Sequence, residues 1–495
     1  MSARRLRVSA VLTSTLALGV AAHAAGLPAI SFNLEPFPDA QGLVATYSTS
    51  GRIDTRNPFF QSLGTNGRSC ATCHVASQAM SISPPDIRLR FHATRGQDPL
   101  FAPVDGANCA TARRNDPAAH SLLLGHGLIR VGLTIPANPQ FTLSVVHDPY
   151  GCALTTNPVS GAVTASVYRR PLPSTNLGFL STVMWDGRET LSALNSGDTF
   201  LANLEADLVD QAKSAVMIHA QGAAPSSVQL GRIVDFELQL YTAQLLDWSA
   251  GLLSARGANG GPVNLASQEY YPGANDSLGA DPSGASFDSS SMAVFSAWAS
   301  AGPHDSNWDG GAAARRTIAA GERLFNTAPL TITGVRGLND NAALGKPASI
   351  AGTCTTCHDS PNIGNHSLPL PLDIGIGHSG LPNFESDPQI AAALSAVDEA
   401  DLPVFRLDGC PDPFHQGQTA PIYTTDPGKA LLTGQCADVN RLKGPVLRGL
   451  AARAPYFHNG AAASLGQVVD FYDKRFNMDL SAEQKADLIA FLGTL

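Results

Sequence analysis

The chain carries little charge, and positive charge in particular is scarce. Only 15% of its 495 residues are charged, 32 Lys and Arg stand against 41 Asp and Glu, and the formal net charge is −9 at pH 7. A protein that binds nucleic acid needs Lys and Arg to contact the phosphates. The composition therefore argues against a nucleic-acid partner.

Long hydrophobic runs are also scarce. The N-terminal stretch "MSARRLRVSAVLTSTLALGVAAHAAG" has a basic start, an apolar middle and small residues around Ala24, which is the pattern of a secretory signal peptide. No other stretch approaches the roughly eighteen apolar residues of a membrane-spanning helix. We therefore predict a signal peptide at residues 1–24, export to a bacterial periplasm and no stable membrane span.

Clear patterns of secondary structure are few, and 46 Gly and 34 Pro favour loops and turns. The spacing of apolar residues predicts helices over residues 231–248 and 311–326. Capping-box patterns predict two more helices, which begin after Ser464 and Ser481. The alternation in "QFTLSVVH" (140–147) predicts one strand of a small sheet. We expect a mainly α fold with long loops and little β structure.

One short motif occurs twice in this loop-rich sequence. It appears as "SCATCHVAS" at residues 69–77 and as "TCTTCHDS" at residues 353–360. Each copy has two cysteines three positions apart and a histidine directly after the second cysteine. The residues are Cys70, Cys73 and His74 in the first copy, and Cys354, Cys357 and His358 in the second.

Three kinds of chemistry use such cysteine pairs. Structural zinc sites and thioredoxin-like redox pairs do not require a histidine at the next position. Covalent haem attachment requires all three residues, because both thiols bond to the haem vinyl groups and the adjacent imidazole is then held at the iron. The motif therefore predicts two c-type haems, with His74 and His358 as iron ligands.

Four cysteines lie outside these motifs. In an oxidising compartment, the simplest of their three pairings is Cys109–Cys152 with Cys410–Cys436. Buried thiols without a disulfide are the alternative.

Three further segments, together with the two motifs, indicate a resemblance to a known family. They are "MWDGRET" (184–190), "LVDQA" (208–212) and "GPVLRGLAARAPYFHNGAAASLGQVVDFY" (444–472). In this order, the chain resembles the bacterial di-haem cytochrome c peroxidase family, which includes the MauG-like enzymes. The resemblance implies two cytochrome c-like haem domains, expected at residues 30–310 and 311–495. Residues 85–165 and 250–310 look like insertions.

The resemblance also implies roles for the two haems and for several residues. The N-terminal haem is expected to be the reactive one, the C-terminal haem to transfer electrons, and Trp185 to lie between them. The second axial ligand of the C-terminal haem stands fourteen residues after the histidine of "YFHNG", which here is Tyr472. Tyrosine is typical of MauG-like enzymes and methionine of the peroxidases proper, so Met478 is the alternative ligand. This choice matters because the axial ligand tunes the haem potential.

A calcium ion between the domains is a further implication of the resemblance, although no carboxylate cluster in the sequence specifies one. Over the open haem face, family peroxidases place a Gln and, ten residues later, a Glu. Gln211 matches the first, but Gln221 stands where the Glu is expected. His219 is our candidate replacement as acid–base group, because imidazole titrates near neutral pH. It could instead bind the iron or be a surface histidine.

These observations lead to one main hypothesis and two alternatives. The main one is an exported, MauG-like di-haem oxidoreductase that activates peroxide or O₂ at the His74 haem and oxidises an electron-rich substrate, with Trp185, Gln211 and His219 as catalytic candidates. The second is an ordinary di-haem cytochrome c peroxidase that takes electrons from a small redox protein. The third is an electron carrier without catalysis.

Overall fold

The computed structural model describes residues 30–191, 200–300, 310–358, 370–378, 388–414 and 419–495. The predicted signal peptide lies outside these ranges and stays a prediction. In the described part of the chain, none of the helices has both the length and the hydropathy that crossing a membrane requires.

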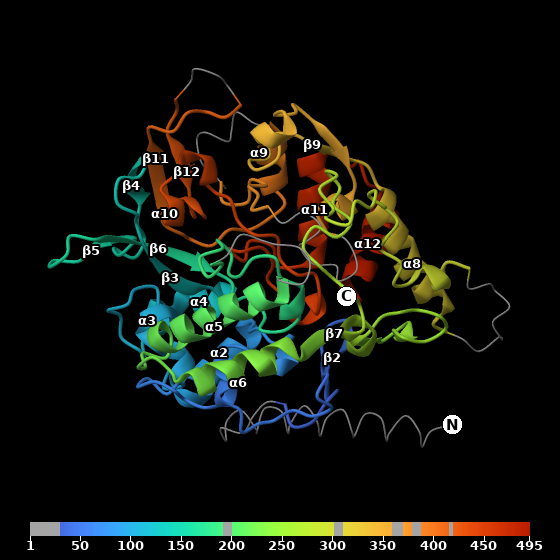
Figure 1. Cartoon of the computed structure of the whole chain (residues 1–495), viewed down its shortest axis with the longest axis horizontal. Coiled ribbons are helices and arrows are strands. Elements are labelled where there is room, and N and C mark those ends of the chain that lie inside the picture. The colour runs from blue at the N-terminus through green and yellow to red at the C-terminus, as the bar shows by residue number, and fades with distance from the viewer. Residues whose placement is uncertain (1–29, 192–199, 301–309, 359–369, 379–387, 415–418) are drawn as a thin grey trace.

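Helices gather in two groups, one from each half of the sequence (Figure 1). The earlier group contains α2, α3, α4, α5 and α6, and the later group is built around α8, α9, α11 and α12. The helix bounds are α2 Pro84–Thr94, α3 Pro103–Gly106, α4 Ser121–His126, α5 Phe200–Ile218, α6 Ser227–Leu238, α7 Pro262–Ala266, α8 Ala312–Thr327, α9 Pro388–Leu394, α10 Ala430–Thr433, α11 Leu465–Phe476 and α12 Ala482–Gly493.

Strands form small antiparallel sheets around these helices. Their orders are β1-β2-β7-β8, β3-β6-β5, β12-β11-β4 and β10-β9. The strand bounds are β1 Pro36–Pro38, β2 Gly42–Ser48, β3 Ile129–Thr134, β4 Thr142–His147, β5 Leu154–Thr156, β6 Val163–Arg169, β7 Leu240–Asp247, β8 Gly251–Leu252, β9 Leu330–Ile332, β10 Ile350–Gly352, β11 Val404–Asp408 and β12 Ile422–Thr424.

Helix is the more abundant structure, as expected, but the fold is mixed and contains more β structure than the sequence patterns indicated. Much of the additional sheet comes from residues 129–169, which begin inside the expected insertion at 85–165 and extend four residues past it. The predicted strand at residues 140–147 is confirmed as β4, which pairs with β11. Short strands of this kind carry too few residues to show a clear alternation.

The predicted helix over residues 231–248 is half wrong. Helix α6 ends at Leu238, and residues 240–247 form β7, which pairs with β2 from Ser48↔Leu240 to Gly42↔Asp247. The apolar residues of this segment fit both the period of an α-helix and that of a β-strand. Pairing with the distant strand β2 therefore decides that the segment is a strand. The other helix predictions are confirmed: α8 covers 312–327, and Ser464 and Ser481 are the N-caps of α11 and α12.

The two halves of the chain share a core. One buried cluster combines residues of β3 and β6 with residues of β11 and the segment 430–439. Both predicted disulfides are present, Cys109–Cys152 and Cys410–Cys436. The second ties the end of β11 to the turn after α10, next to this cluster. The expected domains at 30–310 and 311–495 are thus joined by a sheet and by a common core.

Candidate functional site

The two Cys-x-x-Cys-His motifs adopt the same local conformation. Their first three residues form single 3₁₀ turns, η2 Cys70–Thr72 and η9 Cys354–Thr356. In each, the backbone N–H of the residue before the turn donates to the threonine hydroxyl three positions on, at 3.0 Å and 2.9 Å. The histidine N–H donates to the carbonyl of the first cysteine, at 3.0 Å and 2.9 Å. Each motif therefore presents two thiols and an imidazole from one tight turn.

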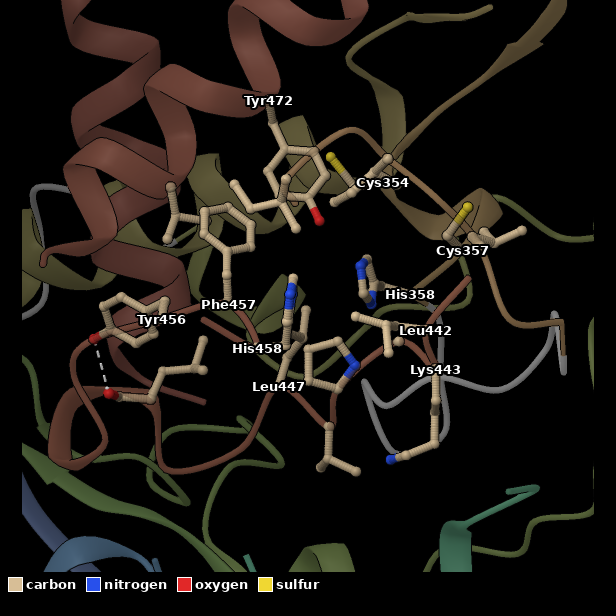
Figure 2. A pocket seen from close by; sticks show the side chains of 18 of the residues that line it. Cys354, Cys357, His358, Leu442, Lys443, Leu447, Tyr456, Phe457, His458 and Tyr472 are labelled. Carbon is tan, nitrogen blue, oxygen red and sulfur yellow. Dashed lines mark hydrogen bonds between the residues drawn. The ribbon is translucent and has the colours of Figure 1, made fainter. Parts of the chain in front are cut away.

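Each motif opens into its own cavity. The N-terminal cavity is defined here as the one lined by Cys70, Cys73 and His74, and the C-terminal cavity as the one lined by Cys354, Cys357 and His358. Figure 2 shows His358 and the two sulfurs on one side of the C-terminal cavity, with Tyr472 and Phe457 reaching in from other segments. Many of the remaining lining side chains are apolar, among them Leu330, Ile332, Leu372, Val469 and Phe476. Such walls suit a large, mainly apolar cofactor.

The histidines are held in the form that an iron ligand needs. Burial lowers the pKa of both His74 and His358 to about 4, so both imidazoles are neutral at pH 7. The Nδ1 atom of His74 lies 3.1 Å from the carbonyl oxygen of Met80. This contact makes Nδ1 the protonated nitrogen and leaves Nε2 as the atom with a free electron pair for a metal. The buried Nδ1 of His358 has no hydrogen-bond partner among the described residues.

A group of buried or half-buried cations at the cavities, Arg170, Lys443 and Arg453, has no carboxylate partner among the described residues. Arg170 and Lys443 line both cavities and Arg453 lines the C-terminal one. Within the described ranges, Arg170 donates to backbone carbonyls, including those of Gly127 at 2.9 Å and Ile82 at 2.6 Å. Burial, with a contribution from Arg453, lowers the pKa of Lys443 to about 7. Buried cations are costly unless an anion compensates them, and the carboxylate groups of a haem would do so.

These observations fit covalently bound haem better than zinc. A structural zinc site needs four Cys or His ligands that converge on one point. No group of three or more His, Cys, Asp or Glu in the described ranges converges as a metal cluster. The same finding leaves the calcium ion implied by the resemblance as a prediction.

Trp185 belongs to the wall that the two cavities share. The shared lining residues are Arg170, Pro171, Leu172, Trp185, Lys443 and Val446. The indole Nε1 donates to the carbonyl of Arg170 at 2.8 Å, and the ring lies 6.2 Å from that of His458. His458 is buried, with its pKa lowered to about 4 by burial. Trp185 thus stands between the two motifs.

Both candidate second ligands line the C-terminal cavity. Tyr472 projects from α11, and its hydroxyl points into the cavity across from His358 (Figure 2). Burial, followed by the nearby thiols of Cys357 and Cys354, raises the pKa of Tyr472. Met478 follows α11 and packs against Phe476 in the same cluster. The hydroxyl makes no hydrogen bond to a described residue.

One face of α5, continued by His219 directly after the helix, lines the N-terminal cavity and carries the other candidates. Gln211, Ala212, Ala215, Val216 and His219 all contribute to it. The spacing of these positions matches one face of an α-helix, so Gln211 and His219 lie along the same wall. Gln221, at the position of the missing carboxylate, is exposed and does not line the cavity.

The structure adds a carboxylate that sequence patterns did not reveal. Asp105, from α3, is hydrogen-bonded to Nδ1 of His219 and to the guanidinium of Arg68. Asp105 belongs to the expected insertion at residues 85–165. No motif marks it, because the sequence separation from His219 is 114 positions.

Glu237 is a second carboxyl group that was missed. It lies on α6, lines the N-terminal cavity, and has one buried oxygen without a partner in the described chain. Burial raises its pKa to about 8, so it is a neutral acid at pH 7.

Comparison with known proteins gives partial matches. No protein-family model matches the chain. The chain is 30% identical over 156 residues to "Cytochrome-c peroxidase IdrP1" of Pseudomonas sp. (strain SCT), which is 29% of this chain and 36% of that protein. It is 29% identical over 151 residues to "Cytochrome-c peroxidase IdrP2" of Denitromonas iodatirespirans, again 29% of this chain and 36% of the relative.

A shorter match of higher identity is to "Cytochrome c551 peroxidase" of Nitrosomonas europaea, with 37% identity over 82 residues, which cover 16% of this chain and 25% of the relative. The matches thus span about a third or less of these relatives. Curated proteins that resemble this chain are named cytochrome-c peroxidases, and c-type haem is the cofactor that this name implies.

Proposed function

We propose that the protein is an exported di-haem c-type peroxidase that reduces peroxide with electrons from a small redox protein. The observation that carries the proposal is the pair of separate cavities, each with a Cys-x-x-Cys-His turn, that meet at Trp185. The names of the similar proteins favour this ordinary peroxidase over the MauG-like enzyme. The two disulfides support export to an oxidising compartment.

In this proposal the side chains divide the work between the cavities. Haem bound at the two motifs would supply the redox chemistry of peroxide reduction. The N-terminal cavity holds His219, which is suited to proton transfer, and Gln211, which can form hydrogen bonds but does not titrate. The C-terminal cavity offers a second ligand from Tyr472 or Met478. Trp185 bridges the distance between the two cavities as the route for electrons. The overall reaction consumes one H₂O₂, two electrons and two protons and yields two waters.

A MauG-like variant of this function is the second candidate, because one observation favours it. The hydroxyl of Tyr472 points into the C-terminal cavity opposite His358 (Figure 2). An oxygen ligand lowers the haem potential relative to a thioether. A haem with that ligand would accept electrons poorly from a high-potential donor and would suit oxidation of an electron-rich substrate.

The test begins with the purified holoprotein. Its mass should exceed that of the mature polypeptide by two haems, and its ferric spectrum should show one high-spin and one low-spin haem. Peroxide should be consumed when a reduced small cytochrome is supplied. Ready reduction of one haem by ascorbate would select the ordinary peroxidase, and resistance to ascorbate the MauG-like variant. Two low-spin haems that do not respond to peroxide would contradict both and indicate an electron carrier.

A further inference from the structure

A buried hydrogen-bond network joins Arg68, just before the first haem-binding motif, to His219, just after α5, through Asp105. Asp105 accepts from Arg68 through one carboxylate oxygen and from Nδ1 of His219 through the other. Asp105 and Arg68 are 5% and 4% exposed. The side chain of His219 is 32% exposed and lines the N-terminal cavity. The hydrogen-bond network therefore runs from the protein interior to the wall of the N-terminal cavity.

Hydrogen bonds to backbone carbonyls hold this network in place. Arg68 also donates to the carbonyl oxygens of Pro99 at 2.8 Å, Leu100 at 2.6 Å and Ala102 at 3.0 Å. These residues directly precede α3, which carries Asp105. Burial opposes ionisation of Asp105, but Arg68 and His219 outweigh it, and the pKa of Asp105 lies below its usual value. The carboxylate is therefore charged and has its position fixed from two sides.

The protonation of His219 follows from this contact. A carboxylate accepts hydrogen bonds, so Nδ1 of His219 is the nitrogen that carries the proton, and Nε2 keeps its electron pair. No described residue forms a hydrogen bond with Nε2. A carboxylate behind an imidazole fixes its tautomer and orientation and stabilises the imidazolium that forms when Nε2 takes up a proton.

We propose that Asp105 is a positioning residue, which holds His219 as the acid–base group of the N-terminal cavity. This inference rests on the proposed peroxidase function and deepens it. Nε2 of His219 would accept a proton from one oxygen of H₂O₂ and donate it to the other oxygen while the O–O bond breaks, so that the first water leaves. Two electrons from the redox donor and two protons from solvent convert the remaining oxygen into the second water.

The segment around α3 thereby supplies the carboxylate that is missing at position 221, just after α5. Gln221 replaces the expected acid in the sequence, and its side chain lies away from the cavity. Acid–base catalysis is thus divided between two residues. His219 transfers the proton, and Asp105, from the expected insertion, orients the imidazole of His219.

The experiment compares holoprotein variants with two readouts, peroxide turnover and the association rate of cyanide. Hydrogen cyanide must lose its proton to bind ferric iron, so cyanide probes the same base without turnover. We expect Asp105→Asn to slow both by at least ~10-fold and His219→Ala by about 100-fold. In the double variant, Asp105→Asn should cause no further loss, since it acts through His219.

Asp98→Asn is the matched control. Asp98 pairs with Arg90 at 2.7 Å in the same segment but does not line the cavity, and both rates should stay within about twofold of wild type. Additive losses in the double variant, or unchanged cyanide binding in Asp105→Asn, would overturn the inference. Conversion of a low-spin to a high-spin haem by His219→Ala would also overturn it, because His219 would then be an iron ligand.

Two further outcomes keep the inference separate from the proposed function. If Asp105→Asn does not fold, half-exposed His219 still permits the test, and an unchanged cyanide rate in His219→Ala overturns the inference. If wild-type protein does not consume peroxide but the variants still slow cyanide binding without additivity, the peroxidase function fails and the Asp105–His219 pair stands.

Discussion

Tyr472 is the side chain on which the choice between the two functional variants depends. Its hydroxyl faces His358 across the C-terminal cavity (Figure 2). Met478 belongs to the same lining and lies in one apolar cluster with Phe476. If the hydroxyl oxygen is the second ligand, Tyr472→Phe removes it and Met478→Leu leaves it in place. We expect Tyr472→Phe to convert the low-spin ferric spectrum to high-spin and Met478→Leu to leave it unchanged.

Absorption and electron paramagnetic resonance spectra of the two ferric holoproteins measure this directly. Loss of the low-spin signal in Met478→Leu, with Tyr472→Phe unaffected, would assign the ligand to methionine and remove the MauG-like variant.

Glu237 gives a prediction about pH. Burial raises the pKa of its carboxyl group to about 8 in the folded protein, against about 4.3 in an unfolded chain. Between these values the unfolded state has lost the proton that the folded state keeps, so stability falls as pH rises through this window. Glu237→Gln removes the effect. We expect the variant to be little different near pH 5 and more stable than wild type by a few kcal/mol at pH 8–9.

Thermal unfolding of both holoproteins between pH 5 and pH 9 checks this expectation. Parallel curves of melting temperature against pH would show that Glu237 does not hold a proton in the folded protein.

Among the helices, the contact between α8 and α12 depends on a glycine. A Cβ atom at Gly321 would lie 2.0 Å from the backbone oxygen of Asp487 and 2.7 Å from Cβ of Phe491. The helices would have to separate to accept it, and overpacking of this kind costs about 1–3 kcal/mol. We therefore expect Gly321→Ala to lower the melting temperature by several degrees.

Gly231, inside α6, is the matched control because a Cβ atom there meets nothing within 4 Å. Ala is the better helix former by roughly 0.5–1 kcal/mol, so Gly231→Ala should raise the melting temperature slightly. Equal effects of the two substitutions would refute the close helix contact.

The same helices show what patterns in the sequence can predict. The spans of α8 and of the two C-terminal helices were correctly predicted, since capping residues and apolar faces act within a few turns. The segment after Leu238 was wrongly predicted as helix, because its apolar residues became a strand through pairing with β2. That partner lies almost two hundred positions away, so the local spacing of apolar residues cannot predict the pairing.

Arg169 is a buried link between the two halves of the chain. Its Nε and Nη2 donate to Asp426 at 2.6 Å and 2.9 Å, and Nη1 contacts Asp186 of the "WDGR" segment. Arg169 is 1% exposed. Removing one member of such a buried pair leaves an uncompensated charge and costs about 3–5 kcal/mol. We expect Arg169→Met to destabilise the holoprotein by this amount in denaturant unfolding.

Arg406 serves as the control, since its pair with Asp408 is 40% exposed on both sides. Exposed pairs contribute about 0–1 kcal/mol, so Arg406→Met should change the midpoint of denaturant unfolding little. If Arg169→Met were equally mild, the halves would be held together by the β4–β11 sheet and the shared apolar core instead.

The sequence alone was enough to predict covalent haem attachment. Cys-x-x-Cys-His needs only five consecutive residues, and a tight turn brings its thiols and imidazole together, so reading it required no tertiary information. Folding determined which distant groups meet around those turns. Trp185 in the shared wall, the buried cations, and Asp105 behind His219 come together through long-range packing and charge compensation, which depend on contacts between segments far apart in the chain.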